Sequence, residues 1–237
     1  MSGILKLQVK LMISVIDIKS FGEYVSAMEI APLMGNKVLF RGQKKYRNLL
    51  PSIARKDSHV NTTGNEKRML EQLLLLGSSK LSENDHNEWN LLIKAQHFEL
   101  KTRCLDWTSN PLVALWFACE NSIDEDSYVY LFSADFGALP DKSKSPFEQP
   151  HVCIYQPSFS NERVTAQHGW FTLHNYDEEQ QRFIPLEELE DSNLLEYRIP
   201  KEIKKNLLEN LDRCGINKST LFPDLSGLCA YINQKFT

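Results

Sequence analysis

The sequence predicts a single α+β domain, with helices mainly in the N-terminal half and strands mainly in the second half. Apolar residues at helical spacing recur mostly before Glu120, whereas short β-rich runs follow mostly after it. The chain has 237 residues, of which 42% are hydrophobic and 24% are charged. These values are ordinary for one globular domain with a sizeable core. We therefore expect one domain over residues 1–237.

Residues 1–19 are expected to form an N-terminal strand and extension, and residues 20–235 the core. Between Ile4 and Ile16, apolar residues alternate with mostly polar ones, which predicts a half-buried strand. This apolar stretch is too short to span a bilayer, so we expect neither a signal peptide nor a membrane anchor.

The expected helices carry recognisable start and stop signals. Ser20 is the predicted cap of the first helix, which Pro32 and Gly35 end. The second and third helices are expected to pack as a hairpin. The helices are predicted from Phe21 to Ile30, Asn65 to Leu76, Glu88 to Phe98, Glu202 to Leu211 and Asp224 to Ile232.

The expected strands are short runs rich in β-branched and aromatic residues. Between two of them, the stretch from Gly137 to Pro150 is long for a loop, so we expect it to be mobile or functional. The strands are predicted from Lys37 to Phe40, Tyr128 to Phe132, Val152 to Tyr155, Arg163 to Leu173 and Tyr197 to Ile199.

The stretch from Ala95 to Ala118 is the most informative part of the chain. Asn110 or Ser109 can cap a helix in which Pro111 suits the first turn, and the residues that follow are apolar nearly all round. A buried helix preceded by hydroxyls, a carboxylate and an indole resembles a site for an anionic group such as phosphate. The alternative is a helix cap beside a core tryptophan.

Phe40-Arg41-Gly42-Gln43 offers a second candidate site. A strand that ends in arginine and glycine can present a guanidinium to a phosphate, while the missing Cβ lets main chain approach closely. Arg41 is therefore a candidate phosphate ligand, and the lysines around it are expected to be solvated. The other cations of this stretch are Lys37, Lys44, Lys45, Arg47, Arg55 and Lys56.

Two Gln-His pairs add candidate acid–base groups. His97 and His168 follow Gln96 and Gln167, and imidazole can transfer protons near neutral pH. The alternatives are a hydrogen-bonded core residue for His97 and a β-bulge for His168. The histidines lack the spacing of a metal site. The chain also has no G-x-S-x-G elbow, Walker loop or G-x-G-x-x-G motif.

Charge and cysteine content favour a reduced, cytoplasmic protein without a membrane partner. The net charge of −4 gives no global sign of nucleic-acid or membrane binding. The five cysteines are scattered and odd in number, which fits free thiols better than a disulfide framework.

Five segments in order closely resemble the FRG domain family, from about residue 20 to about residue 232. The sequence departs from the family at Phe98-Glu99-Leu100-Lys101, where an aromatic followed by Gly-Leu-Pro is more common. This departure puts the backbone shape of one turn in question. The segments are LFRGQ (39–43), LLPSIAR (49–55), AQHFELKTRCLDWTSNPLVALWFAC (95–119), RVTAQHGWFTLH (163–174) and STLFPDLSGL (219–228).

A weaker similarity links two of these segments to ADP-ribosyltransferases of the R-S-E type. It implies a split antiparallel or mixed sheet and NAD as substrate, with no metal. Arg41 would clamp the phosphates, and Gly42 and Gln43 would belong to the same cofactor-binding site. Thr108 and Ser109 would bond the nicotinamide ribose, and Trp107 or Trp170 would stack on a ring.

The third piece of that pattern, a late strand with a catalytic glutamate, is incomplete. On the candidate strand Glu162–Thr172, Gln167 occupies the expected place but Gly169 follows where a Glu belongs. Asp106 or Glu162 would supply the carboxylate, Gln167 with His168 could replace it, or the site is inactive. His97 or His168 would deprotonate the acceptor.

The resulting hypothesis is an NAD-dependent ADP-ribosyltransferase that modifies RNA or DNA and acts as a bacterial toxin or phage-defence effector. An antitoxin or inhibitor protein would be a further partner. One alternative is a non-catalytic nucleotide or nucleic-acid sensor, and another is a metal-independent ribonuclease that uses His97 and His168. The first hypothesis requires Arg41 to face the start of the central helix across a shared dinucleotide cavity.

Overall fold

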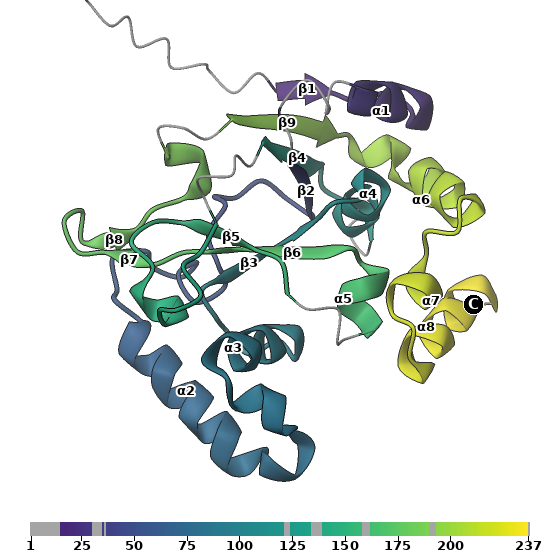
Figure 1. Ribbon diagram of the computed structural model, residues 1–237. Helices are drawn as coiled ribbons and strands as arrows, with labels where there is room; N and C mark the ends of the chain where they lie inside the picture. Colours follow the sequence, from purple (N-terminus) through teal and green to yellow (C-terminus); the bar gives the residue numbers. More distant parts are fainter. Residues whose placement is uncertain are drawn as a thin grey trace, which may run out of the picture.

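The computed structural model describes residues 15–29, 35, 37–120, 124–133, 139–157, 162–189 and 193–236. Within these ranges the protein has an α+β fold built on a seven-stranded mixed sheet, as the sequence predicts, and helices occur in both halves of the chain (Figure 1). The strand order is β1-β9-β4-β2-β3-β6-β5, and β1 runs parallel to β9 while the other neighbours pair antiparallel.

The strands of the large sheet are β1 (Val15–Asp17), β2 (Val38–Gln43), β3 (Cys104–Thr108), β4 (Ser127–Ser133), β5 (Cys153–Tyr155), β6 (Gly169–Leu173) and β9 (Asn193–Ile199). A separate hairpin pairs β7 (Tyr176–Asp177) with β8 (Arg182–Phe183). The helices are α1 (Phe21–Ala27), α2 (Thr63–Leu76), α3 (Glu88–His97), α4 (Pro111–Cys119), α5 (Glu162–Ala166), α6 (Lys204–Arg213), α7 (Lys218–Leu221) and α8 (Leu225–Phe236).

The sheet is nearly divided between β2 and β3. Along β2, each residue from Val38 to Gln43 has a partner on β4, whereas the pairing of β2 with β3 is confined to Phe40 and Thr108 among the described residues. Beyond that pair the two strands separate. The fold is therefore two half-sheets, β1-β9-β4-β2 and β3-β6-β5, joined at one point.

Each half-sheet has its own helix on the same face. Phe40 packs in a core cluster with α4, and Cys104 packs in another with α3. Because paired residues and alternate residues of a strand share a face, Phe40, Thr108 and Cys104 point to one side of the sheet. Helices α3 and α4 therefore cover this face on opposite sides of the split.

The predicted capping residues explain where two of the helices begin. Ser20 accepts a hydrogen bond from the Glu23 N–H at the start of α1, and Asn110 accepts one from Leu112 N at the start of α4. Asn110 is therefore the cap of the central helix, and the helix is buried as expected. Helices α2 and α3 pack together as a hairpin (Figure 1).

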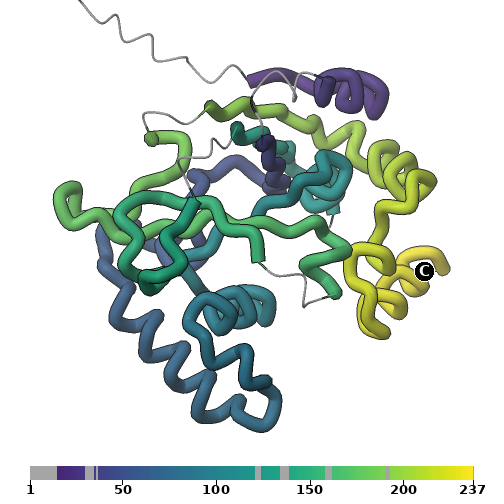
Figure 2. Tube along the Cα trace, in the orientation of Figure 1, coloured from purple at the N-terminus to yellow at the C-terminus, as the bar shows by residue number. Residues whose placement is uncertain are grey.

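The stretch from Arg163 to Leu173 was expected to be one strand, and its first half is instead helix α5. Arg163 O accepts an i+4 hydrogen bond from Gln167 N, and Val164 is buried. His168 then reverses the chain with a φ of 49°, so β6 begins at Gly169. Figure 2 shows this short helix beside the C-terminal segment, which packs against it through α7.

Two further expectations need correction. Strand β2 continues through Gln43, so Arg41 lies within the strand rather than at its end. The described part of the N-terminal strand is exposed rather than half-buried, with Val15 at 52% and Ile16 at 38% exposure. The predicted strand residues before Val15 lie outside the described residues, as do Pro32 and Gly137.

Gly42 is required by the packing of α4 on β2. A Cβ at this position would lie 2.0 Å from the Ala114 carbonyl oxygen and 2.5 Å from the Ala118 nitrogen. Gly42 therefore allows the backbone of α4 to pack closely on β2. The sequence predicted that it would allow close approach to a phosphate.

We predict that Gly42→Ala destabilises the protein by about 3 kcal/mol or more, since backbone atoms of α4 cannot move aside as a flexible side chain would. Urea unfolding measures this change. Gly22→Ala is the control, because a Cβ on exposed Gly22 meets nothing within 4 Å. Equal stability of the two variants would contradict the packing role.

Candidate functional site

A cavity of about 430 Å³ opens at the split between the half-sheets. Its walls come from β2, β3 and β6, from the C-terminal end of α3, and from α4 and α5. Its size falls in the usual range for small-molecule sites. Of the predicted site residues, those that line it are Arg41, Gly42, Gln43, His97, Asp106, Trp107, Thr108, Gln167 and Trp170, whereas Ser109, Glu162 and His168 do not.

Arg41 extends across the split to β3. Its Nη1 donates to the Asp106 carbonyl oxygen at 2.6 Å and lies 3.8 Å from the Asp106 carboxylate, while its Nε is buried without a hydrogen-bond partner. The side chain is 11% exposed. Burial lowers the pKa of Arg41 to about 10, against the opposing effect of Asp106, so the guanidinium stays charged at neutral pH.

The Asp106 carboxylate is the more accessible member of this pair, at 57% exposure. Gln96 Nε2 donates to both of its oxygens, at 3.1 and 3.0 Å. Gln96 Oε1 in turn accepts from the Thr102 hydroxyl at 2.6 Å, which fixes the orientation of the amide. Gln96 therefore positions Asp106, a role that its sequence position beside His97 did not indicate.

Trp107 is a core residue. Its Nε1 donates to the Thr172 hydroxyl at 3.0 Å, and its ring lies 5.4 Å from that of Phe132. It lines the cavity but is only 3% exposed, so little of its surface is open to a ligand, and its stacking role stays a prediction. Trp170 is likewise buried, with the Lys37 ammonium 4.0 Å from its ring centre.

The hydroxyls expected to bind ribose are occupied or distant. The Thr108 hydroxyl donates to the Gln167 carbonyl at 2.7 Å and accepts from Asn110 N at 3.0 Å. Ser109 is exposed outside the cavity, where its N–H donates to the carbonyl of His168. Both residues hold the turn between β3 and α4 against the turn before β6.

His97, at the end of α3, and Gln167, just after α5, both line the cavity. Burial lowers the pKa of His97 below its ordinary value of 6.5, and the nearby charge of Arg163 lowers it further. The imidazole is therefore neutral at pH 7 and able to accept a proton. Gln167 Nε2 donates to the Leu221 carbonyl at 3.0 Å. His168 and Glu162 are exposed on the turn and helix that precede β6.

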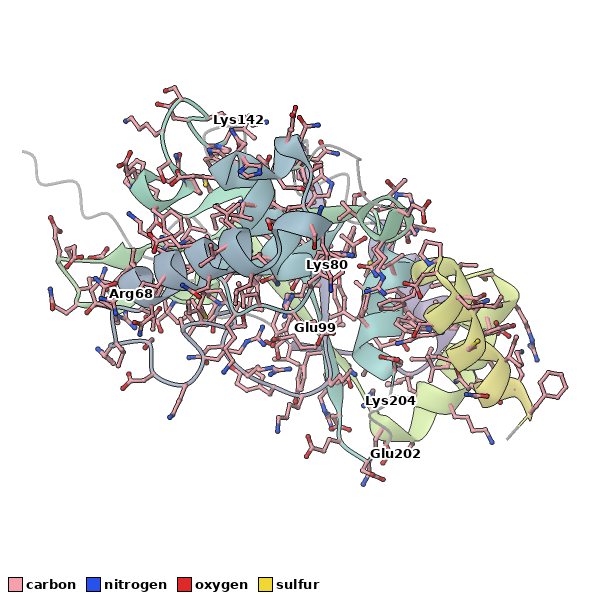
Figure 3. The ribbon with its side chains drawn as sticks, turned by 90° about the horizontal axis from the view of Figure 1, so that it is seen from below. Arg68, Lys80, Glu99, Lys142, Glu202 and Lys204 are labelled. Atoms are coloured by element: carbon pink, nitrogen blue, oxygen red, sulfur yellow. The ribbon has the colours of Figure 1, made fainter. Side chains whose placement is uncertain are left out.

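Sequence reasoning missed three groups of the cavity wall. Arg47 and Ser52 come from the loop after β2, where the sequence singled out Arg41 alone as a ligand. Glu99 follows the end of α3 (Figure 3) and adds a carboxylate. The LLPSIAR segment contains Ser52, but neither its spacing nor its composition indicates a cavity.

Residues 36–127 match the family model described as the FRG domain. The similarity to the FRG domain is therefore shown for this part of the chain. The match spans the LFRGQ, LLPSIAR and central segments, and with them Arg41, Arg47, Gln96 and Asp106. No curated protein and no solved structure matches the chain.

The FRG domain match ends before the two later segments of the resemblance, which lie beyond Ser127. These later segments supply α5, β6 and α7, so they complete the cavity wall around the matched part. Within the described ranges, no three His, Cys, Asp or Glu side chains are arranged to hold a metal ion. Every helix in those ranges is too short or too polar to cross a bilayer.

The turn at Glu99 has a backbone conformation that favours glycine. Glu99 has a φ of 65°, and the hydrogen bonds from Glu99 N to Gln96 O and from Leu100 N to Ala95 O form a Schellman motif. Glycine is the residue best suited to this conformation, since a Cβ costs roughly 1–2 kcal/mol in the left-handed region.

We predict that Glu99→Gly raises the free energy of unfolding by about 0.5 kcal/mol or more, after allowance for the greater entropy of glycine in the unfolded chain. Glu99→Ala is the control, because it removes the same carboxylate but keeps the backbone strain. Thermal unfolding of both variants measures the difference. Equal melting temperatures would show that the turn carries no such strain.

A buried hydrogen-bond network supports the cavity from the second half-sheet. Thr172, which accepts from Trp107, lies 3.0 Å from His174 Nε2, and His174 Nδ1 lies 3.4 Å from the Ile184 carbonyl. These partners suit a neutral ring with its proton on Nδ1. Burial lowers the pKa of His174 to about 4, with a further contribution from the charge of Arg41.

We predict that His174 makes the protein acid-sensitive. Its ordinary pKa is 6.5 and its folded value is about 4, so its stabilising contribution is complete above pH 6.5. About 3 kcal/mol is then lost as the pH falls to 4, because the unfolded chain binds the proton more tightly. Urea unfolding at several pH values measures the loss. The loss of stability at low pH should shrink in His174→Gln. It should persist in the control variant His59→Gln, because His59 is exposed.

Proposed function

We propose that the protein binds NAD in the cavity at the split and transfers ADP-ribose to a nucleic acid. The observation that carries this proposal is the convergence of the buried Arg41 guanidinium and the accessible Asp106 carboxylate in one cavity of suitable size. A fixed cation can hold a pyrophosphate, and a nearby carboxylate can stabilise the positive charge that develops on ribose.

In the proposed reaction, the bond between the nicotinamide nitrogen and the ribose carbon breaks, and its electron pair leaves with nicotinamide. Asp106, held by Gln96, stabilises the cationic ribose. An acceptor oxygen or nitrogen attacks the same carbon, and its proton passes to neutral His97. Arg41 keeps the diphosphate in place throughout, so that the ribose carbon stays beside Asp106.

The proposed acceptor is RNA or DNA, because phosphate contacts can be supplied by the basic residues that follow β2. The group-transfer activity would suit a cytoplasmic toxin or phage-defence effector that a dedicated inhibitor protein restrains. Mass spectrometry of nucleic acid and protein from cells that express the chain identifies the acceptor by its added mass.

We predict that Asp106→Asn lowers the rate of nicotinamide release by about 100-fold, since the neutral amide cannot stabilise positive charge. Chromatography of NAD reactions with an RNA or DNA acceptor measures the rate. NAD binding should change little, because Arg41 is retained. Glu202→Gln is the control, since Glu202 is exposed outside the cavity (Figure 3). Absence of nicotinamide release by the unaltered protein with every acceptor would refute the transfer reaction.

A non-catalytic nucleotide sensor is the second candidate function. It is supported by the position of Glu162, the candidate late glutamate, which does not line the cavity. A sensor would bind its nucleotide and leave it intact for hours in calorimetry. The ribonuclease hypothesis receives less support, because its second histidine, His168, does not share the cavity with His97.

A further inference from the structure

The loop between β2 and α2 brings a second arginine to the cavity. Arg47 lines the cavity together with Arg41, and its Nε is buried without a hydrogen-bond partner. Among the described residues, Arg47 forms no ion pair with a carboxylate. The half-buried guanidinium therefore has hydrogen-bonding capacity that the protein leaves unused.

The loop is held in place by contacts to its main chain. Gln43 Nε2 donates to the Arg47 carbonyl at 3.0 Å, and Arg55 Nε donates to the Leu50 carbonyl at 3.0 Å. Leu49 N donates to the Glu187 carboxylate at 3.0 Å. These bonds fix the backbone that carries Arg47 without engaging its guanidinium, which is the arrangement expected of a preorganised ligand site.

The charges around this loop are unbalanced. Arg41, Arg47 and Arg55 interact electrostatically with one another, and the pKa values of Arg41 and Arg55 fall through burial and mutual repulsion. Asp106 is the carboxylate that opposes this effect on both. Of the two guanidiniums that line the cavity, Arg41 has one carboxylate, Asp106, within ion-pair distance, and Arg47 has none among the described residues. The pair therefore keeps positive charge at a partly buried position, which an anion would neutralise.

We propose that Arg47, with the charge of Arg55 behind it, forms a second phosphate subsite beside Arg41, so that the cavity selects ligands with two linked phosphates. This inference rests on the proposed function in using the same cavity, but it concerns binding and requires no turnover. Arg41 holds one phosphate and Arg47 the next, and each guanidinium can bond two phosphate oxygens.

Isothermal titration calorimetry with ADP and AMP tests the subsite. We expect the unaltered protein to bind ADP at least about tenfold more tightly than AMP. One additional charge-assisted hydrogen bond, from Arg47 to the second phosphate, accounts for an affinity difference of this size. Arg47→Gln should lose this preference by weakening ADP binding and leave AMP binding nearly unchanged. Arg47→Lys should retain part of the preference, because the positive charge is kept.

Arg68→Gln is the matched control, since Arg68 is an exposed arginine on α2 that lies apart from Glu99 at the cavity wall in Figure 3. Its ADP preference should equal that of the unaltered protein. Melting temperatures confirm that each variant is folded. The subsite is refuted if ADP and AMP bind equally, if neither binds, or if Arg47→Gln weakens both ligands to the same extent.

Failure of the subsite and failure of the transferase proposal give different results. Nicotinamide release together with equal binding of ADP and AMP would refute the subsite alone. An ADP preference that depends on Arg47, without nicotinamide release, would refute the transfer reaction and leave a diphosphate-binding sensor.

Discussion

The rest of the structure depends on the separation of β2 from β3 beyond the Phe40–Thr108 pair. In a continuous antiparallel sheet, the Asp106 carbonyl would accept a hydrogen bond from the neighbouring strand. A main-chain carbonyl without a partner is costly when shielded from water. The Arg41 guanidinium takes the place of the missing strand contact. The same side chain therefore completes the backbone of one half-sheet and lines the cavity that the separation creates.

The helices maintain this separation because each packs on its own half-sheet. The α4 backbone lies so close to β2 that only glycine fits at position 42, which fixes the helix relative to that strand. Helix α3 is fixed to β3 through Cys104 and its neighbours. The C-terminal end of α3 thereby carries Gln96 and His97 to the gap. The site is made from the ends and edges of two rigid units, and its geometry follows from their packing.

The sequence predicted structure well where interactions between neighbouring residues determine it. It predicted less where contacts between residues far apart in the chain determine it. Asn110 and Pro111 define the start of α4 by local capping, and Arg41 stands out through its neighbouring glycine. The residues from Arg163 to Ala166 have the composition of a strand, but they form a helix because Val164 and the ion pair between Arg163 and Asp224 fix them to distant parts of the chain. The roles of Gln96 and Trp107 depend on partners that no spacing rule identifies.

The two charged groups of the site, Arg41 and Asp106, differ in burial and therefore in the role that each can play. The Arg41 guanidinium is anchored by the main chain and almost covered, so it offers a fixed positive charge at low cost in side-chain entropy. The Asp106 carboxylate remains open to solvent and is oriented by one amide. Because Arg41 also bonds the main chain of Asp106, the separation between the two charges is set by the fold rather than by the ligand. A cavity with this arrangement can hold an anionic part of a ligand while it presents a carboxylate to a neighbouring neutral or cationic part, which is the division of roles that both the transferase and the sensor proposals require.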